Sequence, residues 1–406
     1  MAAGTAKPGV SKTKEAAPLG LAVLLACMSS LSPFSIDTFF PSFRVMQADF
    51  GVTALQMQQT ITGYLLPYAI MSLFHGSLSD ALGRRVVVLG GLAVYAVASF
   101  ACMLAPGFGT LLLFRAAQGV SAGAGMVVAR AVVRDLYDGA AAQRLMSTIM
   151  MLFSLAPAIA PIIGGWIHVW AGWRAVFGML TLLALVLLLA CYWRLPETHP
   201  LHRRISFGIA PLLRGSWQVF SDTKFRCLAF ASALSFSAFH LYVAAAPAII
   251  FDHWHLSETQ FGSMFVPGIS GMALGAWLSG RFAGRVHASH QILYGFAISF
   301  SAALLITLAH LSSASVPIYW QQLALAVLAL GIQFAAPVLN ISMLDLFPHM
   351  RGTASSVLNC LSLLLSTFVM GFVGPHLQHS MALLSAYGIF VTLLAALLWR
   401  LSRTEQ

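Results

Sequence analysis

Apolar runs long enough to cross a membrane recur along the whole of this 406-residue chain. Of its residues, 59% are hydrophobic and only 8% are charged, whereas a soluble domain carries about 25% charged residues. A helix needs about 20 apolar residues to span a bilayer. The runs therefore predict an all-α membrane protein with twelve transmembrane helices, over residues 19–43, 54–78, 86–105, 109–132, 144–168, 174–195, 225–250, 259–280, 290–310, 316–342, 353–376 and 381–400.

The longest internal hydrophilic stretch, residues 196–224, divides these helices into six and six. Leu78-Ser79 and Leu278-Ser279 occupy similar places after the second helix of each half, which indicates two pseudo-symmetric six-helix bundles of the kind found in transporters with internal repeats. The predicted parts are a tail over 1–18, a first bundle over 19–195, a basic connector over 196–224 and a second bundle over 225–402.

The net charge of +10 could suggest a nucleic-acid partner, but the positions of the charges argue against one. With the N-terminus inside, the basic residues gather on the cytoplasmic side, which is the positive-inside bias. We therefore expect a multi-pass protein of the bacterial cytoplasmic (inner) membrane with both termini cytoplasmic. Its basic residues would contact anionic lipid headgroups; they include Lys7, Lys12, Lys14, Arg134, Arg144, Arg203, Arg204, Arg214, Arg281, Arg285, Arg351, Arg400 and Arg403.

Residues 76–85 form a short charged turn between two apolar runs, with the sequence Gly76-Ser-Leu-Ser-Asp80-Ala-Leu-Gly83-Arg84-Arg85. This pattern resembles the loop between the second and third helices of major facilitator superfamily transporters. The resemblance implies that Gly76 allows close helix packing and that Gly83 permits a tight turn. It also implies that Asp80, Arg84 and Arg85 form a charge cluster at the cytoplasmic gate.

Asp37 is the only acid well inside an otherwise apolar predicted span. Ionisable residues within the membrane are costly and therefore mark functional sites. Arg115, in the fourth span, lies at a comparable depth, so the two charges could interact if their helices are neighbours. We predict Asp37 as the proton carrier and Arg115 as the residue that tunes proton binding and release. The alternatives are an acid at the outer water interface and an arginine that caps exposed carbonyl groups.

The fifth predicted span places Pro157, Pro161 and Gly164 along one helical face, with Gly165 beside them. Prolines remove backbone donors and bend a helix, and glycines allow another helix to approach. The run resembles the fifth-helix pattern of the antiporter branch of the superfamily. It predicts a hinge and a packing surface between the two halves.

Together, these motifs resemble the twelve-span drug:proton antiporters, and most closely the bicyclomycin- and chloramphenicol-resistance (Bcr/CflA-type) group. The resemblance implies export of small amphipathic or drug-like compounds by rocker-switch alternating access, driven by the proton gradient and without a cofactor. Some relatives carry a second acid two turns before the first-span aspartate; here that position is Ser29, which favours simpler proton coupling.

The substrate pocket is expected to be mostly apolar with a few polar groups. Candidates lie in the second, fourth, seventh, eighth, tenth and eleventh spans, and each could instead be a packing residue. They are Gln59, Tyr64, Tyr68, Gln118, Phe236, His240, Met264, Phe265, Gln333, Asn340 and Asn359.

Two other functions stay open at this level. The same scaffold could carry an amino acid, a sugar or a siderophore-related metabolite, because fold alone does not name a cargo. A membrane-embedded enzyme would need a nucleophile with its base or a metal cluster, and the sequence offers neither, so we expect no enzyme and no metal site. The five cysteines lack the spacing of disulfide frameworks or zinc sites. The expected partners are a small-molecule substrate, protons and membrane lipids, with the protein acting as a monomer.

Overall fold

The computed structural model describes residues 19–204, 207–312 and 315–404, which form helices and no strand. The all-α membrane fold predicted from the sequence is confirmed. The predicted tail over 1–18 lies outside the described residues. The N-terminal half contains α1 (Leu19–Asp37), α2 (Phe43–Phe50), α3 (Ala54–Leu82), α4 (Arg84–Met103), α5 (Phe108–Leu136) and α6 (Gly139–Arg194).

The C-terminal half begins after the short connector helix α7 (Ile209–Ser221), which the sequence analysis did not predict. It contains α8 (Thr223–Ala244), α9 (Ala246–Ala248), α10 (Gly262–Phe282), α11 (Ala288–Ser312), α12 (Ile318–Asp345), α13 (Arg351–Phe368), α14 (Gly374–Leu377) and α15 (Met381–Thr404). Five single turns complete the described chain: η1 (Phe40–Ser42), η2 (Leu201–Arg203), η3 (Ile249–His253), η4 (Glu258–Gln260) and η5 (Val369–Val373).

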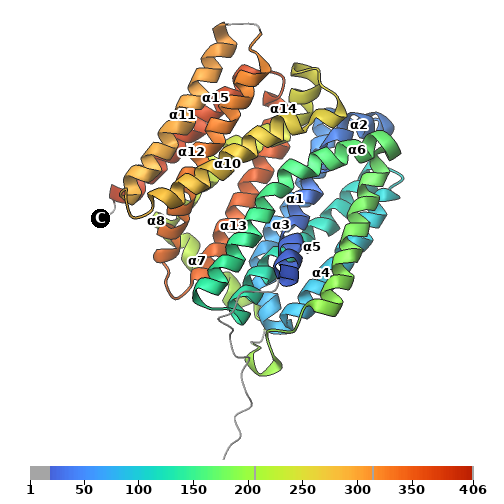
Figure 1. Ribbon diagram of the computed structural model, residues 1–406, viewed down its shortest axis with the longest axis vertical. Helices are drawn as coiled ribbons and strands as arrows, with labels where there is room; N and C mark the ends of the chain where they lie inside the picture. The colour runs from blue at the N-terminus through green and yellow to red at the C-terminus, as the bar shows by residue number, and fades with distance from the viewer. Residues whose placement is uncertain (1–18, 205–206, 313–314, 405–406) are drawn as a thin grey trace, which may run out of the picture.

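Ten of the described helical segments are long and apolar enough to cross a membrane. One of them holds two predicted spans, because α6 has 56 residues and is interrupted at Gly172. Gly172 has φ 79°, a backbone conformation that favours glycine, and Figure 1 shows α6 as two arms. The 29-residue helix α3, which carries three glutamines near its start, is not among the ten. With α3, and with α6 counted as two arms, these segments correspond to the twelve predicted spans.

The first predicted span, 19–43, lies within one apolar helical segment, Leu19–Phe50, but it is not one continuous helix. Helix α1 ends at Asp37, and η1 and α2 follow before the chain turns back at Gly51. Pro33 lies inside α1, and Pro41 occupies the start of η1, where a missing N–H donor costs least. The acid predicted to lie well inside a span is therefore the last residue of a helix.

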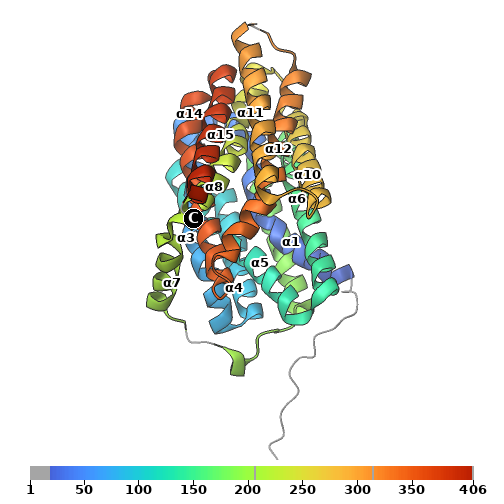
Figure 2. The same cartoon turned by 90° about the vertical axis from the view of Figure 1, so that its left-hand side faces the viewer.

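Contacts between helices arrange eight of them in a closed circuit, which we call the inner ring. In the N-terminal half α3 packs on α5, α5 on α1 and α1 on α6. In the C-terminal half α13 packs on α8, α8 on α12 and α12 on α10, and the circuit closes where α3 meets α13 and α6 meets α10. Consequently α5 faces α12 across the inner ring, and α1 faces α8. Helices α4, α11 and α15 pack on the outside of the two halves, which Figures 1 and 2 show as two bundles.

The two halves share a hydrophobic core at only one end. The first described part of the connector, residues 196–204, lies at the bottom of Figures 1 and 2, and we call this the connector end of the molecule. At the opposite, distal end a single buried cluster includes residues of both halves, such as Phe40 and Phe265, whose ring centroids are 6.4 Å apart. Near the connector the C-terminal half has its own cluster around Phe225 and Met343. Among the described N-terminal residues only Leu73 packs against that second cluster, so the halves are joined mainly at the distal end.

Candidate functional site

Asp37 is a buried carboxylate that has no partner among the described residues. Its residue is 5% exposed, and the part of the chain that the structure describes offers its side chain no hydrogen bond or ion pair. The residues that follow Asp37 are also buried or fixed. Thr38 donates through its hydroxyl to the carbonyl of Phe34 at 2.7 Å, and Phe39 and Phe40 are fully buried. Burying an unpaired carboxylate is costly, and protonation removes that cost. The geometry therefore suits a group that gains and loses a proton.

Arg115 is fully buried in α5 and is held by neutral groups. Its guanidinium donates to the carbonyl oxygens of Ser35 at 3.1 Å and Thr60 at 3.3 Å, and to Gln118 Oε1 at 2.8 Å. The rings of Phe39 and Tyr64 both contact it, each with its centroid 4.5 Å from the guanidinium carbon. Carbonyl oxygens and aromatic faces both stabilise a cation. Nη2 has no hydrogen-bond partner among the described residues.

The structure does not join Asp37 to Arg115. Among the described residues no ion pair connects them, although both lie at the distal half of adjacent helices. The reason is the register of α1. Arg115 binds Ser35, and a residue two positions further along a helix points about 200° away around its axis. The carboxylate and the guanidinium therefore stand on different sides of the end of α1.

Three of the predicted pocket residues instead support Arg115 within the N-terminal half. Gln118 accepts from Arg115 and donates to Ser99 Oγ at 2.7 Å, and Tyr64 donates to Ser32 Oγ at 3.2 Å. Tyr68 packs edge-to-face against Tyr64, with ring centroids 6.1 Å apart. All three side chains are buried, Gln118 and Tyr64 completely. In this conformation they are structural neighbours of the arginine and are not open to a substrate.

Gln59, Met264 and Phe265 lie where the two halves meet at the distal end. Gln59 donates to the carbonyl oxygen of Gly371 at 3.2 Å across the contact between α3 and η5, and Met264 and Phe265 are almost fully buried. The neighbouring Gln58 donates to the carbonyl oxygen of Ala244 at 2.8 Å; the sequence analysis missed it. These residues close the distal end.

An ion pair also closes this end. Arg44 of α2 and Asp252 of η3 bind one another across the two halves, and the Arg44 guanidinium carbon lies 4.7 Å from the centroid of the Phe251 ring. Close backbone packing adds to this contact. A methyl group on Gly165 would collide with the backbone oxygen of Glu258 in the other half, and one on Gly164 with that of Thr38.

Pro157 and Pro161 lie inside a continuous helix, and the one non-helical residue found in α6 is Gly172.

Four predicted pocket residues of the C-terminal half are polar, and only one of them, His240, makes a side-chain hydrogen bond within the described structure. The His240 ring lies 6.3 Å from Phe236, and its Nδ1 is 2.9 Å from Ser366 Oγ. Because that hydroxyl already donates to the Ser362 carbonyl at 2.8 Å, it accepts from His240. Three amides of α12 and α13 are half-buried and make no side-chain hydrogen bond within the described structure, namely Gln333, Asn340 and Asn359.

At the connector end, Arg84 is the centre of a charge cluster. It pairs with Asp80 at 2.5 Å and with Asp135 of α5 at 3.2 Å, and it donates to Ser79 Oγ at 2.6 Å. Glu197 of the connector accepts from the backbone N–H groups of Arg84 at 2.9 Å and Arg85 at 3.2 Å. A carboxylate at a helix N-terminus is stabilised by the free N–H groups and the helix dipole. The connector is thereby fastened to the start of α4.

Gly76 and Gly83, the two glycines of the charged turn over residues 76–85, differ in whether a larger side chain would fit. Gly83 has φ 102° and lies against the side chains of Glu197 and Arg204, so a larger residue would be strained and would displace the connector. A methyl group on Gly76 would meet only Val127, at 4.0 Å, which is an ordinary contact. Close helix packing, which the sequence analysis expected at Gly76, is therefore not what this position requires.

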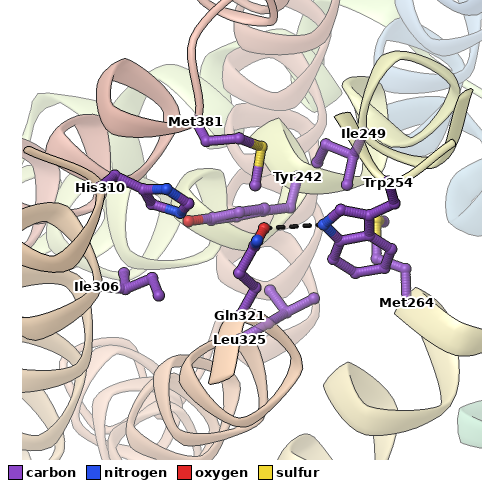
Figure 3. Close-up of a pocket in the computed structure, with 9 residues that line it drawn as sticks. All are labelled: Tyr242, Ile249, Trp254, Met264, Ile306, His310, Gln321, Leu325 and Met381. Atoms are coloured by element: carbon purple, nitrogen blue, oxygen red, sulfur yellow. Dashed lines mark hydrogen bonds between the residues drawn. The ribbon is translucent and has the colours of Figure 1, made fainter. Parts of the chain in front are cut away.

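A small pocket lies inside the C-terminal half near the distal end (Figure 3). Its volume is about 10 Å³, and Trp254 closes one side by donating from Nε1 to Gln321 Oε1 at 2.8 Å. His310 lines it, and its Nε2 has no hydrogen-bond partner in the described structure. The pocket has room for about one water molecule. It belongs to one bundle and not to the space between the two.

The sequence analysis also missed Arg130, which falls inside the predicted span 109–132. The rule that drew attention to Asp37 applies to it equally, because an ionisable side chain within a span is costly. Arg130 is exposed, whereas the flanking Ala129 and Ala131 are buried.

Comparison with known proteins places these features in a family. Residues 25–370 match the sequence model of the Major Facilitator Superfamily. An uncharacterized MFS-type transporter, YdgK of Bacillus subtilis, is 30% identical over 361 residues, which cover 88% of this chain and 89% of that protein. A bicyclomycin resistance protein homolog of Haemophilus influenzae is 28% identical over 376 residues, 91% of each chain.

The fold is also similar to that of solved transporters. A bacterial homolog of the human lysosomal transporter Spinster superposes with a TM-score of 0.70 at 17% sequence identity, covering 95% of this chain and 96% of the other. At this level of identity the similarity concerns the fold alone.

Proposed function

The chain belongs to the major facilitator superfamily, and we propose that it is a proton-coupled antiporter that exports small amphipathic or drug-like compounds across the bacterial cytoplasmic membrane. The observation that carries the proposal is the isolated carboxylate of Asp37, buried at the end of α1 within the inner ring. The relative from Haemophilus influenzae is named for bicyclomycin resistance, which supports export of drug-like compounds.

The proposed orientation places the connector end in the cytoplasm. Arg84, Arg204, Arg285 and Arg351 lie in or beside turns at that end, as the positive-inside rule requires of cytoplasmic loops. The distal contacts between the halves then close the outer side. Under this proposal, a molecule whose halves meet at the distal end has its substrate route facing the cytoplasm.

In the proposed cycle the two halves rock between two arrangements. In the outward-facing form Asp37 takes up a proton and the bound compound leaves; in the inward-facing form Asp37 loses the proton and the next compound binds. Arg115 favours the ionised form of nearby groups, because an arginine keeps its charge at any working pH. Moving one elementary charge across the membrane yields about 2.3 kcal/mol per 100 mV, enough for more than tenfold accumulation.

The test is transport by everted membrane vesicles with and without a proton gradient. Asp37→Asn should abolish gradient-driven movement of a compound that the wild type exports, while the protein still inserts and elutes normally in detergent. Asp49→Asn is the matched control, because Asp49 is an exposed acid of α2 at the same end of the molecule. Undiminished transport by Asp37→Asn would remove this carboxylate from the mechanism.

A further inference from the structure

The connector helix α7 lies along the boundary where two membrane spans begin. Its last residue, Ser221, is two residues before Thr223, the start of α8. About 9 Å earlier along α7, Gly215 lies beside the side chains of Met350 and Thr353 at the start of α13. Two points of α7 are therefore at the level of two helix starts, so the helix runs along the surface of the C-terminal half. Figure 2 shows α7 at the lower left margin of the molecule.

Two sides of α7 are free of charge, and only one of them packs on the protein. On the packed side Ser216 and Val219 are buried. The other side is apolar yet exposed. Ile209, Leu213 and Trp217 follow one another there at intervals of four residues, with exposed fractions of 55%, 48% and 68%. The helix therefore holds three large apolar side chains away from the protein core, and we call them the apolar stripe.

Positive charge borders the apolar stripe. Arg214 is exposed on α7, and Lys224 and Arg226 lie in the first turns of α8. Within the described residues none of the three forms an ion pair with a carboxylate. The one acid of residues 209–226, Asp222, accepts from the backbone N–H of Phe225 at 2.7 Å. Three cations thus stand beside a single carboxylate.

The surface of an anionic bilayer matches both features of α7. An interfacial helix buries its apolar side about 5–10 Å into the boundary between headgroups and acyl chains, and tryptophan is enriched at that depth. Basic residues at the same level attract anionic headgroups. Water would leave the apolar stripe exposed, and a second copy packed through the same patch would bring the two basic borders close together.

We propose that α7 is an interfacial helix that inserts Ile209, Leu213 and Trp217 into the membrane leaflet at the connector end and binds anionic phospholipid headgroups through the basic residues beside them. In the orientation proposed above this is the cytoplasmic leaflet, whose surface is negative. The contact anchors the C-terminal half at the point where the connector enters it. Neither Asp37 nor a substrate takes part in this contact, which is therefore separate from the proposed function.

The experiment places an environment-sensitive fluorescent amino acid in the full-length protein, reconstituted in lipid nanodiscs. One variant carries it in place of Leu213, on the apolar stripe. The matched variant carries it in place of Gln218, an exposed residue about 140° further around the helix. Quenching by lipids with brominated acyl chains is compared with quenching by aqueous iodide. At position 213 the brominated lipids should quench strongly and iodide weakly, and at position 218 the order should be reversed.

Lipid charge is tested with the fluorophore at position 213. Brominated phosphatidylglycerol should quench at least fivefold more per lipid than brominated phosphatidylcholine, because each basic residue near a membrane surface contributes about a fivefold factor in lipid affinity. Arg214→Gln should lower this ratio severalfold. Arg144→Gln removes an exposed arginine of α6 in the other half, with the same change in net charge, and should leave the ratio unchanged. Thermal unfolding verifies that each variant folds.

Three results would overturn the proposal. Iodide quenching as strong at position 213 as at position 218 would place the apolar stripe in water. Protection of position 213 from both quenchers would place the stripe against protein, either the N-terminal half or a second copy. Equal quenching by the two brominated lipids would leave anionic headgroups without a role. The assay needs neither a substrate nor a proton gradient, so its outcome is distinct from that of the transport test with Asp37→Asn.

Discussion

Arg115 donates a 3.1 Å hydrogen bond to the carbonyl oxygen of Ser35, two residues before the acid that the sequence suggested as its partner. The arginine is thus stabilised by neutral oxygens and aromatic rings, and Asp37 has no counter-ion among the described residues. Within the described residues, Asp37 and Arg115 lie on adjacent helices but do not contact each other. This separation allows a proton to neutralise Asp37 without first breaking an ion pair.

Replacing Arg115 by alanine should destabilise the N-terminal half. The carbonyl groups of Ser35 and Thr60 and the amide of Gln118 would lose their donor inside the protein. An unsatisfied buried polar group costs about 1–3 kcal/mol, so the loss should exceed 2 kcal/mol. Thermal unfolding in detergent measures it, and Arg144→Gln, an exposed arginine of α6, is the control. An unchanged Tm for Arg115→Ala would contradict this account of the buried guanidinium.

Removing the ion pair between Arg44 and Asp252 should favour opening of the distal end. Both side chains are more than half exposed, so the pair contributes only about 0.2–1 kcal/mol, which corresponds to a shift of up to about fivefold. Spin labels at Ala48 and Gln260, exposed residues of the two halves, report the distance distribution. Arg44→Ala should increase the population with long distances between the two labels. The exchanged pair, Arg44→Asp with Asp252→Arg, should restore the wild-type distance distribution. If the exchanged pair behaves like the single variant, the pair has no role in closure.

Adding one methyl group at Gly165 should oppose closure of the same end. The methyl would collide with the backbone oxygen of Glu258 in the other half, and backbone cannot move aside as a flexible side chain can. Overpacking of this kind costs about 1–3 kcal/mol. The spin-label pair measures the effect. Gly90→Ala is the matched control, because a methyl there meets no atom within 4 Å and alanine favours a helix.

Glu197→Ala should release the connector from the charged turn. The variant loses the acceptors for the N–H groups of Arg84 and Arg85 and the partner of Arg204 at 3.8 Å. Loss of about 1 kcal/mol would raise the detached population roughly fivefold, and limited trypsin digestion after Arg204 should accelerate accordingly. Glu197→Asp tests geometry, since its shorter side chain reaches the helix start less well. Cleavage at the wild-type rate in Glu197→Ala would show that the connector is held elsewhere.

Much of the architecture was predictable because it depends on local composition. Apolar runs of bilayer length predict spans wherever they fall, and the predicted boundary between 168 and 174 brackets the break at Gly172. The charged turn was recognisable because its pattern is local. Gly83 takes a positive φ that favours glycine, and the charged residues lie within five positions of it in the sequence. Arg130 was also within reach of the sequence, since it is an ionisable residue inside a predicted span.

The pocket residues were less predictable because helical periodicity tells which residues share a face and not what that face meets. Tyr64, Tyr68 and Gln118 were assigned to a substrate, yet they surround Arg115. The same limit applies to Gln59, which closes the distal end through Gly371.

The sequence alone predicted the number of apolar spans and showed that Asp37 and Arg115 fall within two of them, because hydrophobic length and ionisable side chains are properties of single segments. Only the tertiary structure decided where α1 ends, which oxygens solvate Arg115 and which residues of the two halves meet at the distal end. These outcomes depend on contacts between residues far apart in the chain. No local pattern encodes them.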